Sequence, residues 1–251
     1  MSKRGLRTAL VAVFWLLLWQ ESASLAALPV LLPGPLETLG ALMRLASVPA
    51  FWLSAGASLL RIMIGYLLAL LFGVLLSILC VCSKAAEALL SPLRTLIRAT
   101  PITSFIILVL LWFRVDRVPV LIAFLTVIPI IWYNVQQGIE QVDPELLEMA
   151  KVYTFKPSHL LRYVYLPSVS PYFYSAAATG LGFAWKAGIA AEVIAKPAYS
   201  IGKNLQDAKV YLQTESLFAW TLVVILLSLM LEALLKRLMR KWEQGNGGRK
   251  A

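Results

Sequence analysis

The residue types that carry most enzyme and metal chemistry are sparse in this sequence. The chain has one histidine, His159, and two cysteines, Cys80 and Cys82, which lie near the end of an apolar run. A metal site needs several such ligands together, and no cluster of them accompanies these residues in the sequence. The sequence also lacks the G-x-x-x-x-G-K-[ST] motif that holds nucleotide phosphates. We therefore expect no metal site, no catalytic residue and no cofactor on this chain, and we interpret the cysteines as packing residues.

Three ionisable residues lie where the sequence is otherwise apolar. Arg61 is the only charge between Ala50 and Val81, while Lys186 and Glu192 both lie within Val169–Ala195. Ionisable side chains at membrane depth usually face protein or water, so we name these three residues as candidates for a translocation path. At 100° per residue, Lys186 and Glu192 point about 120° apart and are not a simple intrahelical pair. Two roles remain open for each cation: attracting an anionic solute, or pairing with a carboxylate or reaching an interface.

A polar and basic segment, Glu148–Pro167, separates two long apolar runs. Asp143 is placed to cap a short helix that starts at Pro144, because aspartate favours the N-cap position and proline the first helical position. Pro157 is placed in the same way to start a second short helix, which we expect Pro167 to end. Two short helices in one polar loop would form a docking surface for another protein.

The composition places the chain in a membrane. Of its 251 residues, 60% are hydrophobic and only 14% are charged, which is unlike a soluble protein. The formal net charge of +10 is then expected to reflect lipid headgroup contact and a cytoplasmic bias of basic residues, not nucleic-acid binding. The sequence thus predicts an all-α integral membrane protein.

The apolar runs predict six transmembrane helices. The first begins at Ala9, and we expect a retained span and not a cleaved signal peptide, because Gln20 and Glu21 interrupt the apolar core. Leu32–Leu45 is expected to be an amphipathic helix at the outer surface. Five later spans are expected over Ala50–Val81, Leu89–Phe113 with a kink at Pro101, Val118–Val135, Val169–Ala195 and Leu217–Leu235. Turns or loops are expected at Ser83–Glu87, 114–117, Gln136–Ser168 and Lys196–Glu215.

Basic residues near the span ends predict the orientation. More basic residues lie on one side of the predicted membrane, including the C-terminal cluster: Lys3, Arg4, Arg7, Lys84, Lys151, Lys156, Arg162, Lys236, Arg237, Arg240 and Lys241. The other side has fewer: Arg44, Arg114, Arg117, Lys196, Lys203 and Lys209. By the positive-inside rule the first side is cytoplasmic, which predicts that both termini are inside the cell.

Small residues recur every four positions within Val169–Ala195. They are Ala176, Gly180, Ala184 and Gly188. Such a stripe lets another helix approach closely, so we expect a packing seam, either within the bundle or between two subunits.

The polar loop also carries a sequence motif. The cytoplasmic loop of binding-protein-dependent ABC importer permeases typically contains one motif: Glu-Ala-Ala, three residues, Gly, nine residues, Ile, one residue, Leu-Pro. This sequence resembles the motif at Glu148, Ala150, Val164, Leu166 and Pro167. It departs at Met149, which replaces Ala, at Val164, which replaces Ile, and at Thr154, which replaces Gly. Because a β-branched residue tolerates a left-handed turn poorly, we expect a different bend at Thr154.

The resemblance extends to much of the chain. Leu32–Leu36, Arg61–Gly65, Ala184–Ile194 and Lys203–Leu227 look like permeases for nitrate, sulfonate, taurine or bicarbonate-type anions. It implies a type I ABC importer (MetI-like) transmembrane domain over 50–241, with an ATPase-coupling loop at 136–168. An N-terminal helix and outer segment over 1–49 would precede this core, and a flexible cytoplasmic tail over 242–251 would follow it.

The resemblance also implies function and partners. The chain would be a multi-pass permease subunit in a bacterial plasma membrane and would import a small anionic solute, with a pyrimidine or thiamine precursor or another small organic solute as the alternative. Its expected partners are a second permease copy or paralogue, an extracytoplasmic solute-binding protein, membrane lipid and an ABC ATPase subunit that holds the ATP and Mg. The chain itself would not be an enzyme.

Two other functional classes remain as alternatives. A membrane-embedded enzyme should gather His, Asp or Glu at its span ends, but the sequence has one histidine and few acidic residues. A secondary transporter should show an inverted repeat and broken helices, and we find no convincing repeat.

Overall fold

The computed structural model describes residues 3–25 and 32–247, and within these ranges it contains helices and no strands. At the two ends of the chain lie α1 (Lys3–Leu25), α2 (Pro35–Ala46), α10 (Ile201–Val210) and α11 (Thr214–Gly247). Between them lie α3 (Pro49–Cys82), α4 (Lys84–Ala99), α5 (Ile102–Trp112), α6 (Val118–Glu140), α7 (Pro144–Val152), α8 (Pro157–Leu160), the π-helical turn η1 (Leu161–Tyr165) and α9 (Leu166–Ala195). The all-α prediction is confirmed for the described residues.

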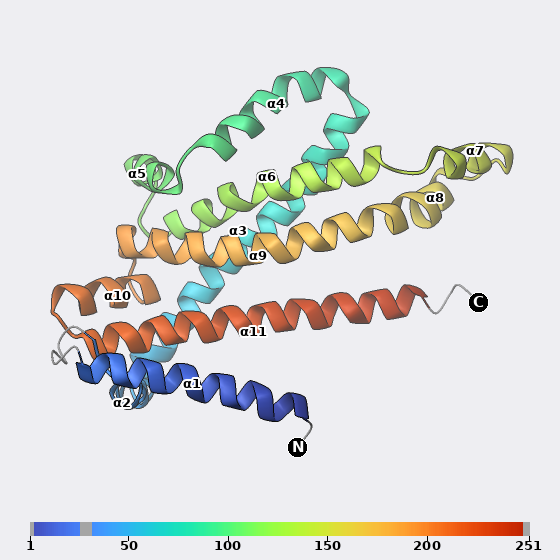
Figure 1. Ribbon diagram of the computed structural model, residues 1–251. Helices are drawn as coiled ribbons and strands as arrows, with labels where there is room; N and C mark the ends of the chain where they lie inside the picture. Colours follow the sequence, from blue (N-terminus) through green and yellow to red (C-terminus); the bar gives the residue numbers. More distant parts are fainter. Residues whose placement is uncertain (1–2, 26–31, 248–251) are drawn as a thin grey trace.

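Three long helices form the centre of the bundle. Helix α6 packs along both α3 and α9, and Figure 1 shows α6, α9 and α11 side by side with α3 crossing behind them. Helices α7 and α8 project from one end of this bundle, whereas α2 and α10 lie at the opposite end. The bundle therefore separates a loop end from a remote end.

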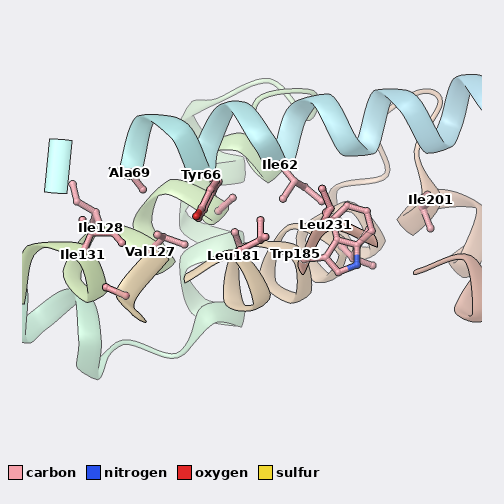
Figure 2. Packing of buried hydrophobic residues seen from close by; sticks show 14 of the residues in the cluster. Ile62, Tyr66, Ala69, Val127, Ile128, Ile131, Leu181, Trp185, Ile201 and Leu231 are labelled. Carbon is pink, nitrogen blue, oxygen red and sulfur yellow. The ribbon is translucent and has the colours of Figure 1, made fainter. Parts of the chain in front are cut away.

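The core lies where α3, α6 and α9 meet. Ile62, Ile131 and Trp185 are each at most 1% exposed, and Figure 2 shows Ile62 and Trp185 beside Tyr66 and Leu181. The Tyr66 hydroxyl donates to the Ala177 carbonyl oxygen at 2.9 Å, which satisfies its polar atom inside the core. Apolar packing and this buried hydrogen bond thus help to join α3 to α9.

Helix length and composition identify some, but not all, of the six predicted membrane crossings. By length and apolar composition, α3, α6 and Thr214–Lys241 of α11 could each cross a membrane, and the α4–α5 pair would add a fourth crossing. Helix α9 has 30 residues and so is about 45 Å long, and it packs on α3 and α6. The count of six stays a prediction, with α1 and α9 as its other members.

The region predicted as a turn at Ser83–Glu87 and one span at Leu89–Phe113 is different. The turn prediction is wrong, because the Ser83 hydroxyl accepts from the Ala86 N–H at 3.2 Å and caps α4. The chain then breaks completely at Pro101 instead of kinking, and α4 meets α5 at 107°. Thr100 is extended, with ψ 127°, as expected for a residue that precedes proline.

Two predicted loops contain more helix than expected. Helix α6 continues through Glu140 into the segment predicted as the loop Gln136–Ser168, because Gln136 is buried and accepts from Arg94 Nη1 at 2.7 Å. A cationic partner on α4 therefore lets a polar residue extend an apolar helix. The predicted loop Lys196–Glu215 contains α10, which the Ser200 hydroxyl caps by accepting from the Lys203 N–H at 3.1 Å.

The structure tests part of what the sequence predicts for the two ends of the chain. The helix predicted within Leu32–Leu45 is confirmed as α2, whereas the predicted continuation of the first span over 26–31 lies outside the described residues. The tail predicted over 242–251 is helical through Gly247, and 248–251 lie outside the described residues.

Candidate functional site

The loop between α6 and α9 begins with the predicted capped helix. The Asp143 Oδ1 accepts from the Glu145 N–H at 2.9 Å, and Pro144 is the first residue of α7. Both features confirm the prediction from the sequence. Of the motif residues on α7, Ala150 is buried, while Glu148 and Met149 are exposed and available to another protein.

Thr154 makes the bend that follows α7. Its φ is +49°, in the left-handed region. The Thr154 N–H donates to the Lys151 carbonyl at 3.0 Å, and the Phe155 N–H donates to the Ala150 carbonyl at 2.9 Å. These two bonds form a Schellman motif, in which the left-handed residue is usually glycine. The bend that the motif's glycine favours is therefore present, and the prediction of a different bend is wrong; threonine adopts it at a cost of about 1–2 kcal/mol.

The second short helix starts at Pro157 as predicted but does not end at Pro167. It continues through η1 directly into α9. In η1 the Leu166 N–H donates to the Leu161 carbonyl, because Pro167 has no N–H and its ring crowds the carbonyl one turn earlier. The Ser168 hydroxyl donates to the Val164 carbonyl at 2.8 Å within the same turn. One helical path of altered pitch thus joins the loop to α9.

The described loop presents apolar and aromatic side chains to the outside. Val152 is 79% exposed, Tyr153 70% and Tyr163 63%. The His159 ring packs between Phe155 and Tyr163, with centroid distances of 6.4 and 5.8 Å. The one histidine therefore lies within a row of three rings, and no group of metal ligands occurs among the described residues. An exposed apolar surface of this kind is typical of a protein contact.

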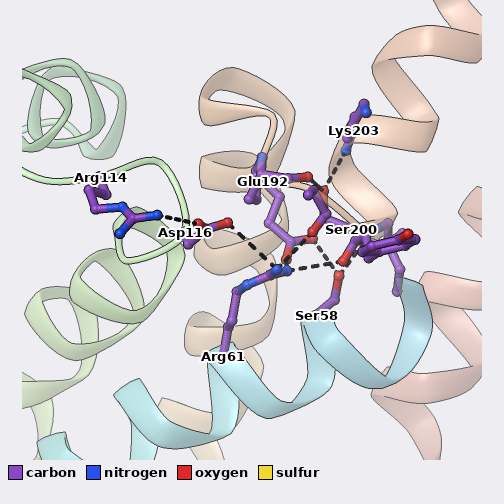
Figure 3. A network of polar contacts seen from close by, with 11 residues as sticks. Ser58, Arg61, Arg114, Asp116, Glu192, Ser200 and Lys203 are labelled. Atoms are coloured by element: carbon purple, nitrogen blue, oxygen red, sulfur yellow. Dashed lines mark hydrogen bonds and ion pairs between the residues drawn. The ribbon is translucent and has the colours of Figure 1, made fainter. Parts of the chain in front are cut away.

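At the remote end, Glu192 and Arg61 form a buried ion pair. Arg61 Nη1 lies 3.4 Å from Glu192 Oε1, and the Glu192 side chain is fully buried. Arg61 also donates to the carbonyls of Ala198 at 2.8 Å and Tyr199 at 3.1 Å. Of the two roles that the sequence left open for Arg61, pairing with a carboxylate is the one that the structure supports. Figure 3 shows the two side chains pointing toward each other.

The same carboxylate attaches α10 to the bundle. Glu192 Oε2 accepts from the Ser58 hydroxyl at 2.7 Å and from the Gly202 N–H at 3.2 Å. Asp116, in the turn between α5 and α6, lies 3.9 Å from the Arg61 guanidinium. No pattern in the sequence indicates that Ser58 or Asp116 belongs to this site, because both lie far from Glu192 along the chain.

Lys186 lies on a different face of α9 from Glu192. Its side chain is exposed, and no carboxylate or hydrogen-bond acceptor contacts it within the described part of the chain. The exposed positions around it on α9 are Ser175, Thr179 and Ala190 together with Phe183, which is 48% exposed. This confirms that Lys186 and Glu192 are not a pair, and it places Lys186 on an exposed face of α9 that has both polar and apolar side chains.

The small-residue stripe packs inside the bundle. Ala176, Gly180, Ala184 and Gly188 are all buried. A Cβ at Gly180 would lie 2.9 Å from Val127 Cγ1 on α6, and one at Gly188 would lie 2.5 Å from Ile62 Cγ1 on α3. Of the two seams that the stripe predicted, the structure therefore contains the one within the bundle.

Comparison with known proteins places these features in a family. The profile of the family described as "Binding-protein-dependent transport system inner membrane component" matches residues 65–244. This range includes the loop motif, the stripe and Glu192.

Individual relatives are similar over most of the chain. The taurine transport system permease protein of Escherichia coli (strain K12) is 26% identical, covering 97% of this chain and 89% of the relative. The putative aliphatic sulfonates transport permease protein of Bacillus subtilis (strain 168) is 30% identical, covering 76% of this chain and 70% of the relative. The bicarbonate transport system permease protein of Synechococcus elongatus is 28% identical, covering 77% and 73%.

A solved structure supports the fold independently. A chain of the MetNI methionine ABC transporter, in inward-facing conformations, aligns with a TM-score of 0.64 and 15% sequence identity. The alignment covers 78% of this chain and 98% of that chain. The fold is therefore that of an ABC importer transmembrane subunit.

Proposed function

The chain belongs to the family of binding-protein-dependent transport system inner membrane components, and from this premise we propose how it couples ATP hydrolysis to import. It is a permease subunit of an ABC importer and a multi-pass membrane protein. The loop between α6 and α9 docks on a separate ATPase subunit, which carries the ATP and Mg. The observation that carries this proposal is the uninterrupted helical path from Pro157 through η1 into α9.

The loop surface has the properties that such docking needs. Glu148 and Met149 are exposed on α7, and the apolar Val152 and Tyr153 are exposed just before the bend. Ala150 and Val164 are buried inside the loop, at 4% and 2% exposure. We assign Ala150, Thr154, Val164, Leu166 and Pro167 to the shape of the loop, and Glu148 and Met149 to contact with the ATPase.

Movement of the loop would reach the remote end through α9. A helix transmits displacement along its axis, and α9 carries Glu192 some 26 residues beyond Leu166 and so about 39 Å away. Arg61 and Glu192 are assigned to holding α3, α9 and α10 together, because they neutralise each other. Switching between inward-facing and outward-facing states would be a rigid shift of packed helices.

The proposed function also implies a location, an orientation in the membrane and partner subunits. The protein lies in a bacterial inner membrane, with both termini and the coupling loop in the cytoplasm. A second permease copy or paralogue completes the path, and an extracytoplasmic binding protein delivers the solute. The support for this orientation is the excess of basic residues on the loop side.

A charge reversal tests the docking assignment. We expect Glu148→Lys to reduce uptake while the subunit still inserts and the complex still hydrolyses ATP, because it reverses a charge on the α7 surface assigned to contact with the ATPase. Glu21→Lys is the matched control, since Glu21 is an exposed glutamate on α1. Undiminished uptake by Glu148→Lys would refute the assignment.

The solute is proposed to be a small anion. The relatives are named as transport permeases for taurine, for bicarbonate and, putatively, for aliphatic sulfonates, and an unpaired lysine on an exposed helix face would attract such anions. We assign Lys186 to the translocation path on this ground. Exposed Lys186 and buried Glu192 would then have separate roles.

Substitution of Lys186 tests the solute assignment. Uptake of radiolabelled taurine, an alkanesulfonate and bicarbonate would be measured in cells that make Lys186→Ala or Lys186→Arg. We expect alanine to lower uptake of the transported anion about tenfold and arginine to retain most of it, with equal amounts of subunit in the membrane. If both variants take up the anion at the rate of the unmodified protein, Lys186 has no role in the path.

A further inference from the structure

A cavity of about 250 Å³ lies at the remote end of the bundle, far from the coupling loop. Its wall is built from the connection between α2 and α3, the first turns of α3, helix α10 and the start of α11. It is separate from the exposed face of α9 that carries Lys186, so it needs a different explanation from the translocation path.

Aromatic rings form much of this wall. Phe51 and Trp220 are buried, at 7% and 4% exposure, and their ring centroids are 4.9 Å apart at an interplanar angle of 32°. Tyr211 also lines the cavity and is 73% exposed, which places it toward the mouth. The faces of such rings attract cations.

The charge of the wall has one sign. Asp207 is the only charged residue among those that line the cavity, and within the described residues its carboxylate has no ion pair or hydrogen bond. The nearby Arg44 is neutralised by Glu215, at 2.6 Å. Lys203, one turn earlier on α10, forms no ion pair with Asp207.

Neutral acceptors complete the site. Asn204 and Gln213 line the same cavity, and each side-chain amide has a carbonyl oxygen that can accept from an N–H group. We propose that this cavity binds a small organic ammonium group, with Asp207 as its counter-ion and Phe51 and Trp220 against its alkyl carbons. The volume admits a group of a few heavy atoms, such as ethanolamine or propylammonium.

Charge-selective labelling tests the proposal. A single cysteine is introduced by Ser216→Cys at the cavity wall, after Cys80→Ala and Cys82→Ala, in the full-length chain in membrane vesicles. We expect a cationic methanethiosulfonate to react faster than an anionic one, and Asp207→Asn to reduce this ratio about fivefold to tenfold. Asp207→Glu should restore the ratio. A ratio that is unchanged by Asp207→Asn would overturn the proposal.

Protection and a control site complete the experiment. Propylammonium should slow the labelling of Ser216→Cys, whereas the neutral propanol should not, and equal protection by both would also overturn the proposal. A cysteine at Val115, exposed in the α5–α6 turn, should keep its ratio when Asp207 is changed. Taurine uptake is recorded in parallel, so that failure of this site is distinguished from failure of transport.

The source of the ammonium group is decided by lipid composition. If phosphatidylethanolamine vesicles protect the cysteine and phosphatidylglycerol vesicles do not, the group is a lipid headgroup. If both vesicles allow labelling and added ethanolamine prevents it, the group is a free amine. Both outcomes support an ammonium site, and labelling that neither source slows contradicts it.

Discussion

Glu192 Oε1 lies 3.4 Å from Arg61 Nη1, and this contact joins the end of α9 to α3 across 131 positions of sequence. The carboxylate is fully buried, yet the Ser58 hydroxyl and the Gly202 N–H also donate to it. A buried charge is tolerable only when it is paired and hydrogen-bonded in this way. The remote end of α9 is therefore fixed to α3 and α10 by one carboxylate.

Removing the cation should destabilise the subunit strongly. Arg61→Ala leaves Glu192 buried without its counter-ion, and we expect a loss of about 3 kcal/mol or more in the free energy of unfolding. The measurement is unfolding of the purified subunit in detergent micelles. Arg114→Ala is the matched control, because the Arg114 side chain is 83% exposed and its loss should change stability by less than about 1 kcal/mol.

A second substitution separates the charge from the packing. Adding Glu192→Gln to Arg61→Ala removes the unpaired charge and keeps an oxygen for Ser58 and Gly202. The double variant should recover part of the lost stability. If it were less stable than Arg61→Ala by the full effect of Glu192→Gln alone, the two residues would not be coupled.

Two glycines on α9 should differ in how alanine at their positions affects stability. A Cβ at Gly188 would lie 2.5 Å from Ile62 Cγ1, whereas a Cβ at Gly182 would have no atom within 4 Å. Ile62 is fully buried and cannot move aside, so Gly188→Ala should cost about 1–3 kcal/mol. Gly182→Ala should be neutral or stabilising, since alanine favours helix. Thermal unfolding of both variants measures the difference, and equal midpoints would contradict the packing seam.

Thr154 should tolerate glycine but not proline. Thr154→Gly relieves the left-handed strain, partly offset by the greater freedom of glycine in the unfolded chain, so a net gain of at most about 1 kcal/mol is expected. Thr154→Pro cannot adopt φ +49° and loses the N–H bond to the Lys151 carbonyl. Hydrogen exchange at the Phe155 amide should slow with glycine and accelerate with proline.

A similar motif provides the control for this bend. At the end of α10, Leu212 has φ +55°, and the Gln213 N–H donates to the Ala208 carbonyl at 2.8 Å. Leu212→Gly should slow exchange at Gln213 and leave Phe155 unchanged. Faster exchange at Phe155 in Thr154→Gly would mean that threonine is not strained there.

Local chemistry made much of the loop predictable from the sequence. Asp143 before Pro144 and the proline at 157 each determined a helix start, because caps and first-turn prolines act over a few residues. The prediction that the second helix ends at Pro167 was wrong, because a local rule for proline does not say whether the helix stops or changes pitch. Proline was expected to stop the helix at 167, whereas a π-helical turn accommodates it through the bond from the Leu166 N–H to the Leu161 carbonyl.

Long-range pairing made the remaining features unpredictable. Gln136 extends α6 because Arg94 of α4 reaches it, and Glu192 is satisfied by Ser58 and Arg61 of α3. These partners lie 42 to 134 positions apart in sequence, beyond the reach of periodicity or capping patterns. The small-residue stripe predicted close packing correctly, but its partner helices became known only with the fold.

The helical path from the coupling loop into α9 is the central element of the proposed mechanism. Inserting two glycines between Tyr165 and Leu166 would break it, because glycine weakens helices and two extra residues rotate the two halves by about 200°. The control is the same insertion between Arg114 and Val115, in the turn at the remote end.

Uptake and basal ATP hydrolysis by the assembled complex in proteoliposomes test this element most directly. With the insertion after Tyr165, we predict that hydrolysis stays within about twofold while uptake falls at least tenfold, and that the control insertion preserves uptake. Uptake that stays at the unmodified level after the Tyr165 insertion would contradict transmission of movement through α9.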